Sequence, residues 1–296
     1  MKGPSMPGPE NGAEAEMPTG TAEAGERHPY RAQSNETAMT RRLTYTATLM
    51  LLLILSSCSV KEDRDVCPCW MQIDLTSCSR YTDLVSLKGW TEREPVFGVR
   101  VPEEEFPLAH EEEVPRGMVH YCAHTDPGAS SISGMKVLVR EGEQAPRLYA
   151  YRADVPAYGE TVTDRVSLHK QYAAVALKID NADDGFGVTV RGNWAGLDLE
   201  TLAPVEAPFL YVPERTEEGL WLFRVLRQGD DSLVLDITGR DGHTLPYDLG
   251  GMIRSTGYDW RATDLDDVIL GVDYVRGEVT VSVVSWEEGL VYDEVL

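Results

Sequence analysis

The sequence predicts an all-β protein with two β-sandwich domains in tandem. Short segments alternate apolar and polar side chains with the period of two that a half-buried strand requires, and glycine, proline and aspartate turns separate them. No long amphipathic helix stands out between these segments. Residues 67–296 supply enough chain for two sandwiches, and we place the boundary between residues 67–164 and 165–296.

The strand pattern recurs along the whole of this region. In its first instance Met71, Ile73 and Leu75 alternate with polar neighbours. We expect residues 81–87 to form a short helix, residues 245–254 to contain a turn of helix, and the acidic residues 101–115 to form a solvated loop. The expected strands are residues 70–75, 135–140, 148–152, 160–168, 172–179, 187–190, 221–226, 232–238, 268–274 and 278–286.

The composition limits the classes of partner. The 296 residues include 49 acidic and 27 basic side chains, which gives a net charge of −22. An acidic excess of this size opposes binding to the phosphate backbone, so the sequence predicts no nucleic-acid partner. A hydrophobic fraction of 42% is that of a chain that folds around a core.

The N-terminal residues do not belong to the folded domains. Residues 1–38 are rich in glycine, proline, glutamate and alanine, so we expect a disordered leader, with Met39 as the candidate start of the natural chain. Residues 39–57 have the order of a secretory signal: Arg41 and Arg42, then the apolar residues 47–55, then small residues. The apolar run is too short to span a bilayer as a permanent helix.

Cys58 follows the signal directly. The sequence LSSC at residues 55–58 resembles the lipobox of bacterial lipoproteins, and this resemblance implies that Cys58 is acylated and becomes the mature N-terminus. The alternative is a signal anchor in which Cys58 is an ordinary cysteine. Residues 58–66 form the expected tether, in which Lys61-Glu62-Asp63 resembles the signal that sends Bacteroidota lipoproteins to the outer face of the outer membrane. A plain flexible spacer is the other interpretation of these residues.

Four cysteines remain after Cys58, and export would place them in an oxidising compartment. Cys67 and Cys69 are separated by one residue, and the small ring between them is geometrically poor. Two pairings are left, in which each of these cysteines reaches either Cys78 or Cys122. Sequence does not choose between them, so Cys67, Cys69, Cys78 and Cys122 are candidate disulfide residues with open connectivity.

A metal site is a weaker interpretation of the same region. His120, Cys122 and His124 alternate, so a strand would place all three on one face, where Cys67 or Cys69 could add a ligand. No CxxC pair with zinc-finger spacing accompanies them. We therefore expect a structural or free cysteine at residue 122 and no metal.

The sequence contains no recognisable catalytic motif. It lacks a G-x-S-x-G elbow, an H-E-x-x-H pair and a P-loop, so we expect neither an enzyme nor a bound cofactor. The tryptophans are spread over the whole chain, and core or edge packing explains most of them without a carbohydrate site.

Several stretches stand in a fixed order along the mature chain: CSVKEDRDVCPCW at 58–70, LHKQYA at 168–173, RQGDDSL at 227–233, LG, GYDW and LDDV within 249–268, and VSVVSW at 281–286. Each is weak alone. Together they resemble the FimB-type fimbrial anchor lipoproteins of Bacteroidales, a family of type V pilus subunits, over nearly all of residues 58–296.

This resemblance implies two transthyretin-like sandwich domains and a role at the base, end or side of a fimbria. Such fimbriae are expected to grow by donor-strand exchange, in which a strand of one subunit fills a groove in the sheet of its neighbour. Stalk subunits open the groove when a protease removes an N-terminal strand behind an arginine, and Arg64 and Arg80 are candidate cleavage points. An anchor is expected to keep its first strand, because the lipid is attached to that segment.

The predicted function is therefore that of a surface-exposed outer-membrane lipoprotein that joins fimbrial stalk subunits to the membrane and limits the length of the fimbria. The alternatives are a surface lipoprotein that binds glycans or host ligands, and a fimbrial tip adhesin.

Replacing Cys58 by alanine tests whether this residue carries the lipid. We expect Cys58→Ala to move the protein from the membrane fraction to the soluble fraction, because acyl chains rather than charge would hold an acidic protein on a membrane. Fractionation followed by immunoblotting measures this change. A variant that stays membrane-bound would contradict the lipobox interpretation.

Overall fold

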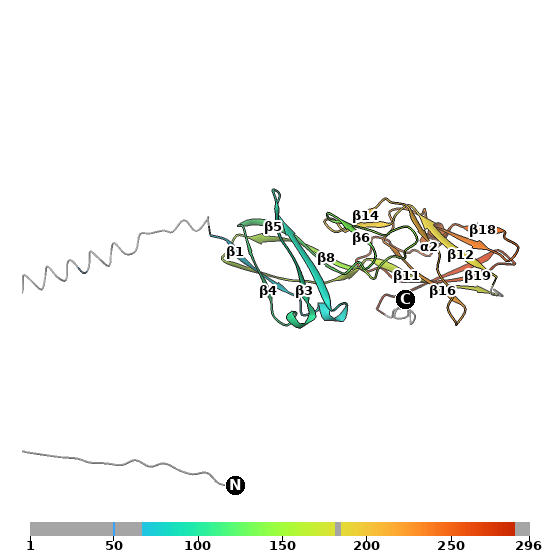
Figure 1. Cartoon of the computed structure of the whole chain (residues 1–296), viewed down its shortest axis with the longest axis horizontal. Helices are drawn as coiled ribbons and strands as arrows, with labels where there is room; N and C mark the ends of the chain where they lie inside the picture. The colour runs from blue at the N-terminus through green and yellow to red at the C-terminus, as the bar shows by residue number, and fades with distance from the viewer. Residues whose placement is uncertain (1–49, 51–66, 181–184, 288–296) are drawn as a thin grey trace, which may run out of the picture. The chain divides into compact units, whose positions relative to one another are not determined.

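The computed structural model describes residues 67–180 and 185–287, together with Met50. All strands described below belong to the unit Asp63–Leu296. The all-β prediction is confirmed, since strands make up most of the described chain (Figure 1). No helix in the described ranges is long and apolar enough to cross a membrane.

Two sheets form the N-terminal sandwich. The smaller sheet has the order β4 (His110–Val114), β1 (Cys69–Asp74) and β9 (Thr161–Arg165), with β1 antiparallel to β4 and parallel to β9. The larger, antiparallel sheet has the order β10 (His169–Lys170), β8 (Tyr149–Ala157), β5 (Gly117–Thr125), β2 (Leu84–Trp90) and β3 (Pro95–Pro102). Two short 3-10 turns, η2 (Cys78–Arg80) and η3 (Glu103–Glu105), lie in the loops.

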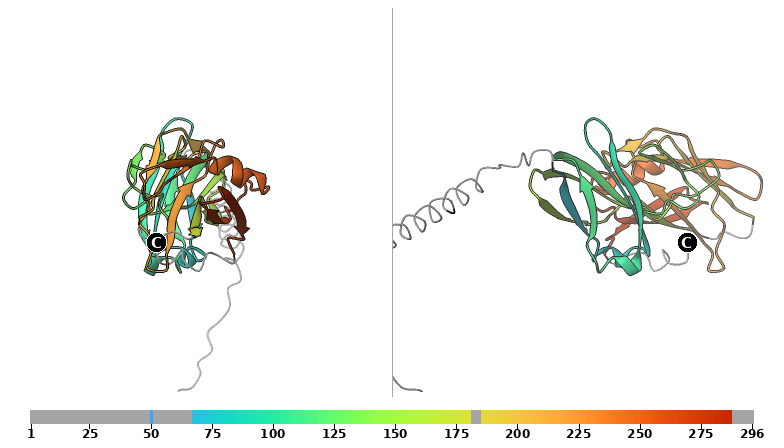
Figure 2. Two further views of the ribbon diagram at one scale, coloured as in Figure 1. Left: turned by 90° about the vertical axis from the view of Figure 1, so that its right-hand side faces the viewer. Right: turned by 60° about the vertical axis from the view of Figure 1, so that its left-hand side comes forward.

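The C-terminal sandwich has two four-stranded sheets. One has the order β16 (Leu220–Leu226), β11 (Tyr172–Asp180), β19 (Asp267–Asp273) and β20 (Glu278–Val284). The other has the order β15 (Phe209–Tyr211), β12 (Gly187–Gly192), β17 (Val234–Thr238) and β18 (Thr244–Tyr247). The short helix α2 (Leu249–Ser255) lies on the outer side of these strands (Figure 2).

A fifth sheet combines segments from both sides of residue 164. Its order is β14 (Pro204–Val205), β13 (Gly196–Asp198), β7 (Lys136–Leu138) and β6 (Ser131–Ser133). The pair β7 and β13 joins residue 137 to residue 197, so backbone hydrogen bonds connect the two halves of the chain. The boundary between residues 67–164 and 165–296 stays a prediction.

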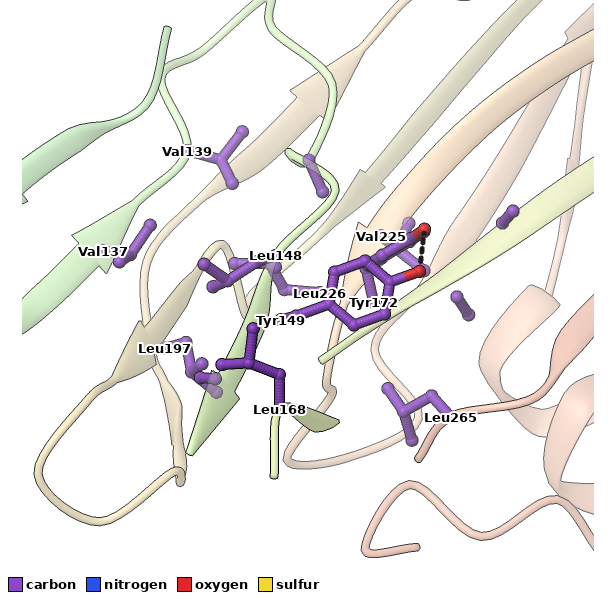
Figure 3. Close-up of a cluster of buried hydrophobic side chains, with 14 of the residues drawn as sticks. Val137, Val139, Leu148, Tyr149, Leu168, Tyr172, Leu197, Val225, Leu226 and Leu265 are labelled. Atoms are coloured by element: carbon purple, nitrogen blue, oxygen red, sulfur yellow. Dashed lines mark hydrogen bonds between the residues drawn. The ribbon is translucent and has the colours of Figure 1, made fainter. Parts of the chain in front are cut away.

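Apolar burial continues through the region between the sandwiches. Figure 3 shows a cluster that includes Leu148 from the first half of the chain with Leu168, Leu226 and Leu265 from the second. All four of these leucine side chains are buried. Edge-to-face packing of Tyr149 on Tyr172, with ring centroids 5.7 Å apart, adds a hydroxyl-to-hydroxyl contact of 3.3 Å.

Two local predictions were wrong. Residues 84–87, expected in a helix, belong to β2, where Val85 and Leu87 are fully buried on alternate positions. Residues 101–115, expected to be a loop, contain the end of β3, the turn η3 and all of β4. The turn of helix expected within residues 245–254 is confirmed by α2, which Asp248 caps through a 3.0 Å hydrogen bond from the Gly251 amide.

A buried ion pair fixes the start of the second half of the chain. The Lys170 ammonium contacts the Asp267 carboxylate, and their side chains are only 3% and 1% exposed. The same Asp267 oxygen accepts a hydrogen bond of 2.8 Å from the Ala174 amide. Asp264 accepts from the Lys170 amide at 2.7 Å and contacts the His169 ring at 3.0 Å. These bonds attach the loop before β19 to the strands β10 and β11.

A second buried cation lies beside this pair. Arg227 donates two hydrogen bonds to the side-chain oxygen of Gln171, at 3.2 and 3.0 Å, and others to the carbonyl oxygens of Trp260 and Ala262. Burial lowers the pKa of the Arg227 guanidinium. Three of the family-like motifs, LHKQYA, RQGDDSL and the GYDW to LDDV stretch, therefore meet in one polar network, which is a structural role for them.

Lys170→Met is expected to lower the free energy of unfolding by about 3–5 kcal/mol, because it leaves the Asp267 carboxylate buried without its cation. Urea unfolding followed by tryptophan fluorescence measures the change. Lys178→Met is the matched control: its side chain is 69% exposed, and we expect a change of less than about 1 kcal/mol. Equal effects of the two substitutions would contradict the importance of the buried pair.

Candidate functional site

The candidate functional site is the first strand, β1, together with the groove that it fills. In β1 the side chains of Cys69, Met71 and Ile73 are fully buried, and Leu75 just beyond the strand is buried as well. Trp70 points the other way and is 48% exposed. The alternation predicted from the sequence is therefore confirmed. Full burial of a Met, Ile or Leu side chain contributes about 1.5–3 kcal/mol, so this strand supplies a large part of the sandwich core.

Backbone pairing holds β1 on both edges. It lies between β4 and β9, and its register places Gln72 opposite Glu111 on one side and Thr163 on the other. The Gln72 side chain donates to Glu111 at 2.9 Å and accepts from Thr163 at 3.2 Å, so all three strands are also joined across the outer surface. Without β1, the facing edges of β4 and β9 would lose their partner and the apolar floor between them would be open to another strand.

The C-terminal end of β1 is fastened by a carboxylate. Asp74 accepts hydrogen bonds from the hydroxyl and the amide of Thr76, at 2.6 and 2.9 Å, and from Arg165 at 2.8 Å. The Thr76 hydrogen bonds, together with Arg165, lower the pKa of Asp74 to about 2. The Ser77 hydroxyl donates to the Val166 carbonyl at 2.8 Å, which continues the attachment past the strand.

The candidate cleavage points lie on either side of β1. Arg80 ends the turn η2 and is exposed, six residues after the last residue of the strand. Arg64 lies outside the described residues, as does the expected lipidation residue Cys58. A cut behind Arg80 would detach β1 with all its buried side chains, whereas a cut behind Arg64 would leave the strand in place and remove the tether.

The four cysteines of the first domain are free thiols in the structure, and their disulfide pairing stays a prediction. Cys67 is exposed, while Cys69, Cys78 and Cys122 are buried. Burial raises the pKa of the Cys78 and Cys122 thiols to about 12 and also raises that of Cys69. Thiols with raised pKa values are poor nucleophiles, so a catalytic role has no support here.

The strand β5 places His120, Cys122 and His124 on one face, as the alternation indicates. Their partners are different groups: His120 contacts the Asp154 carboxylate, and the Nδ1 of His124 donates to the Thr125 carbonyl at 2.8 Å. Burial lowers the pKa of His124. Within residues 67–180 and 185–287, no group of three His, Cys, Asp or Glu side chains is arranged to hold a metal ion.

Sequence reasoning missed two groups that support β1 from the facing sheet. Tyr121 and Tyr151 both donate to the Asp164 carboxylate of β9, at 2.7 and 3.1 Å. Burial raises the pKa of Tyr151 to about 12, and burial together with the Asp164 contact raises the pKa of Tyr121 well above its usual value. Both hydroxyls therefore stay protonated and act as donors. A tyrosine on a strand carries no signal for its carboxylate partner on another strand, which is 43 residues away for Tyr121 and 13 residues away for Tyr151.

No protein-family model and no curated protein sequence matches the chain. Solved structures do match, and they define the class of fold: that of fimbrial and adhesin-like surface proteins of Bacteroidales. One is the fimbrial anchor protein Mfa2 from Porphyromonas gingivalis, with a TM-score of 0.52 and 13% identity over 74% of this chain and 98% of Mfa2.

Two matches come from Bacteroides thetaiotaomicron. A candidate polysaccharide-binding protein has a TM-score of 0.53 and 12% identity over 73% of this chain and 95% of its own. A candidate adhesin has a TM-score of 0.52 and 13% identity over 74% of this chain and 98% of its own. At these identities the likeness shows a shared fold, which is the fold that the sequence resemblance implied.

The Asp74 carboxylate at the end of β1 is expected to make the free energy of unfolding depend on pH. The pKa of Asp74 is below the value of about 3.9 in an unfolded chain, so its stabilisation is complete above about pH 4 and is lost as the pH falls to about 2. We expect Asp74→Asn to lose less stability than the wild type between pH 4 and pH 2 in urea unfolding. Asp180→Asn, at a side chain that is 57% exposed, is the control. Parallel pH profiles for wild type and Asp74→Asn would contradict this role.

Proposed function

We propose that this protein is a lipid-anchored outer-membrane protein that joins a fimbria to the cell surface and limits its length. Its direct partners would be fimbrial stalk subunits, and its link to the membrane would be acyl chains on Cys58. The observation that carries the proposal is the complete insertion of β1 in the smaller sheet of the first domain.

A subunit whose first strand stays inserted cannot accept a donor strand from another subunit at that groove. Because the buried side chains of β1 fill the groove between β4 and β9, a donor strand from another subunit has no place there. The lipid would be attached only eleven residues before Cys69, on the same segment as β1. Keeping β1 would therefore join the membrane attachment to the sandwich core and end the polymer at this subunit.

The likeness to Mfa2, which is a fimbrial anchor protein, supports this proposal. An enzymatic function has no support from the site, whose thiols and tyrosine hydroxyls have raised pKa values and whose carboxylates are engaged in structural hydrogen bonds. A stalk or tip subunit would lose β1 on assembly, whereas an anchor would keep it. The experiment that decides between these roles therefore tests whether β1 stays in the assembled protein.

A disulfide that locks β1 in place tests the proposal. Gln72 and Glu111 lie directly opposite each other on β1 and β4, and their side chains already meet at 2.9 Å, so Gln72→Cys with Glu111→Cys gives a pair within bridging reach. We expect cells with the locked protein to assemble fimbriae that stay attached and have the length of wild-type fimbriae. Electron microscopy measures length, and immunoblotting of the medium measures detached fibres.

Gln72→Cys alone is the matched control for the loss of the glutamine side chain. Mass spectrometry of protein from assembled fibres completes the test, with residues 66–80 expected to remain attached. Loss of fimbriae in the locked variant, or a mature N-terminus that begins after Arg80, would show that β1 has to leave and would assign the protein to the stalk or tip instead.

A further inference from the structure

A groove lies over the larger sheet of the first sandwich, on the face that points away from β1, with Glu200 of the second half of the chain at its wall. Two hollows of about 900 and 450 Å³ form it. Both are lined by Lys88 of β2 and Gly98 of β3, which face each other across the strand pair, so the hollows lie next to each other along these strands. The groove runs along β2 and β3, the last two strands of the larger sheet, of which β3 is labelled in Figure 1. Its size and length suit an extended ligand of several units.

An aromatic platform forms one end of the groove. The Trp90 indole stacks on the His120 ring, with centroids 6.0 Å apart and planes inclined by 27°. His120 is held by Asp154, which also accepts a hydrogen bond of 2.6 Å from Arg152. The platform is therefore fixed by charged partners before a ligand arrives, which keeps the entropy cost of binding low.

The other end of the groove carries an unsatisfied polar atom. His124 is 1% exposed and lines the second hollow. Its Nδ1 donates to the Thr125 carbonyl, and its Nε2 has no hydrogen-bond partner among the described residues. A neutral imidazole in this tautomer presents Nε2 as an acceptor. Arg100 and Asp126, 3.1 Å apart, line the same hollow.

Charge in the groove is balanced, although the whole chain carries a net charge of −22. Four basic side chains and four acidic ones line the two hollows, so neither an anionic nor a cationic polymer finds a matching field. The basic residues are Lys88, Arg93, Arg100 and Arg152, and the acidic residues are Glu92, Glu94, Asp126 and Glu200.

Backbone groups of the central strand under the groove are already paired. Strand β2 hydrogen-bonds to β3 on one side and to β5 on the other, so its backbone groups are not free to pair with a ligand that lies over β2. Recognition has to come from side chains. Planar guanidinium, carboxylate and imidazole groups suit the hydroxyls of a sugar, and an indole face suits its apolar C–H face. We propose that this groove binds a neutral oligosaccharide.

A substitution at Gly98 can block the groove without disturbing the fold. A Cβ at this residue would have no atom within 4 Å, and the backbone is not in the left-handed region. A large side chain at residue 98 would therefore enter the space shared by the two hollows. Because β1 lies in the other sheet, the substitution leaves the proposed anchoring strand untouched.

The test uses the full-length chain, purified in detergent, on an array of neutral and acidic oligosaccharides and extended peptides. We expect the wild type to retain neutral oligosaccharides of several sugar units. Gly98→Phe and Trp90→Ala are each expected to weaken this binding at least about tenfold. Tyr158→Ala, at an exposed tyrosine of the same domain outside the groove, is the control and should bind as the wild type does.

Thermal unfolding shows that each variant is folded. Retention of no neutral oligosaccharide by the wild type, retention of peptides or acidic glycans alone, or undiminished binding by Gly98→Phe would each overturn the proposal. Fimbrial attachment is measured separately, so failure of the groove and failure of the anchoring role give different results.

Discussion

Insertion of β1 between β4 and β9 is the constraint on which the first domain depends. The smaller sheet has only three strands, and β1 is the middle one, so its neighbours have no pairing with each other. The buried residues of β1 also form part of the core that the larger sheet covers. Through Asp164 on β9, the hydroxyls of Tyr121 and Tyr151 connect that larger sheet to the same assembly. Removal of one strand would therefore affect pairing, packing and a polar contact together.

Buried charges perform a different task where β10, the edge strand of the larger N-terminal sheet, meets the C-terminal sandwich. Apolar contacts in Figure 3 bring the two sandwiches together without fixing their register, because the hydrophobic effect has no direction. Lys170 with Asp267, and Arg227 with Gln171, require particular geometry, since a displaced partner would leave a charge or an amide unsatisfied in the interior. Three of the motifs that suggested a family from sequence, those at 168–173, 227–233 and 257–268, are thus explained by packing and polar satisfaction.

The sequence predicted the fold class and the first strand because both depend on period. Alternation of Met71, Ile73 and Leu75 with polar neighbours has only one regular interpretation. The helix prediction for residues 81–87 was wrong because Tyr81, Leu84 and Val85 have the spacing of one helical face. Val85 and Leu87, however, alternate as in a strand. Short apolar runs allow both interpretations, and tertiary pairing decides between them.

Charge misled the prediction in the next segment. Strand β4 carries three consecutive glutamates, and this charge led us to predict a solvated loop. In the structure Glu111 and Glu113 point outward on an edge strand, and Glu112 contacts His110 at 2.9 Å. An edge strand tolerates such residues and benefits from their resistance to aggregation. The groove over β2 and β3 was beyond sequence reasoning, since Trp90 and His120 are thirty residues apart and meet only through the sheet.

The parallel pairing of β1 with β9 has a consequence for how the protein folds. Gln72 and Thr163 meet across 91 residues of chain, so β1 cannot complete its sheet until β9 has been synthesised. Contacts of such high sequence separation form slowly, because a long loop must close before they stabilise anything. During that interval the apolar side of β1 and the edges of its future neighbours are exposed together. Aggregation therefore competes with folding until the sheet closes.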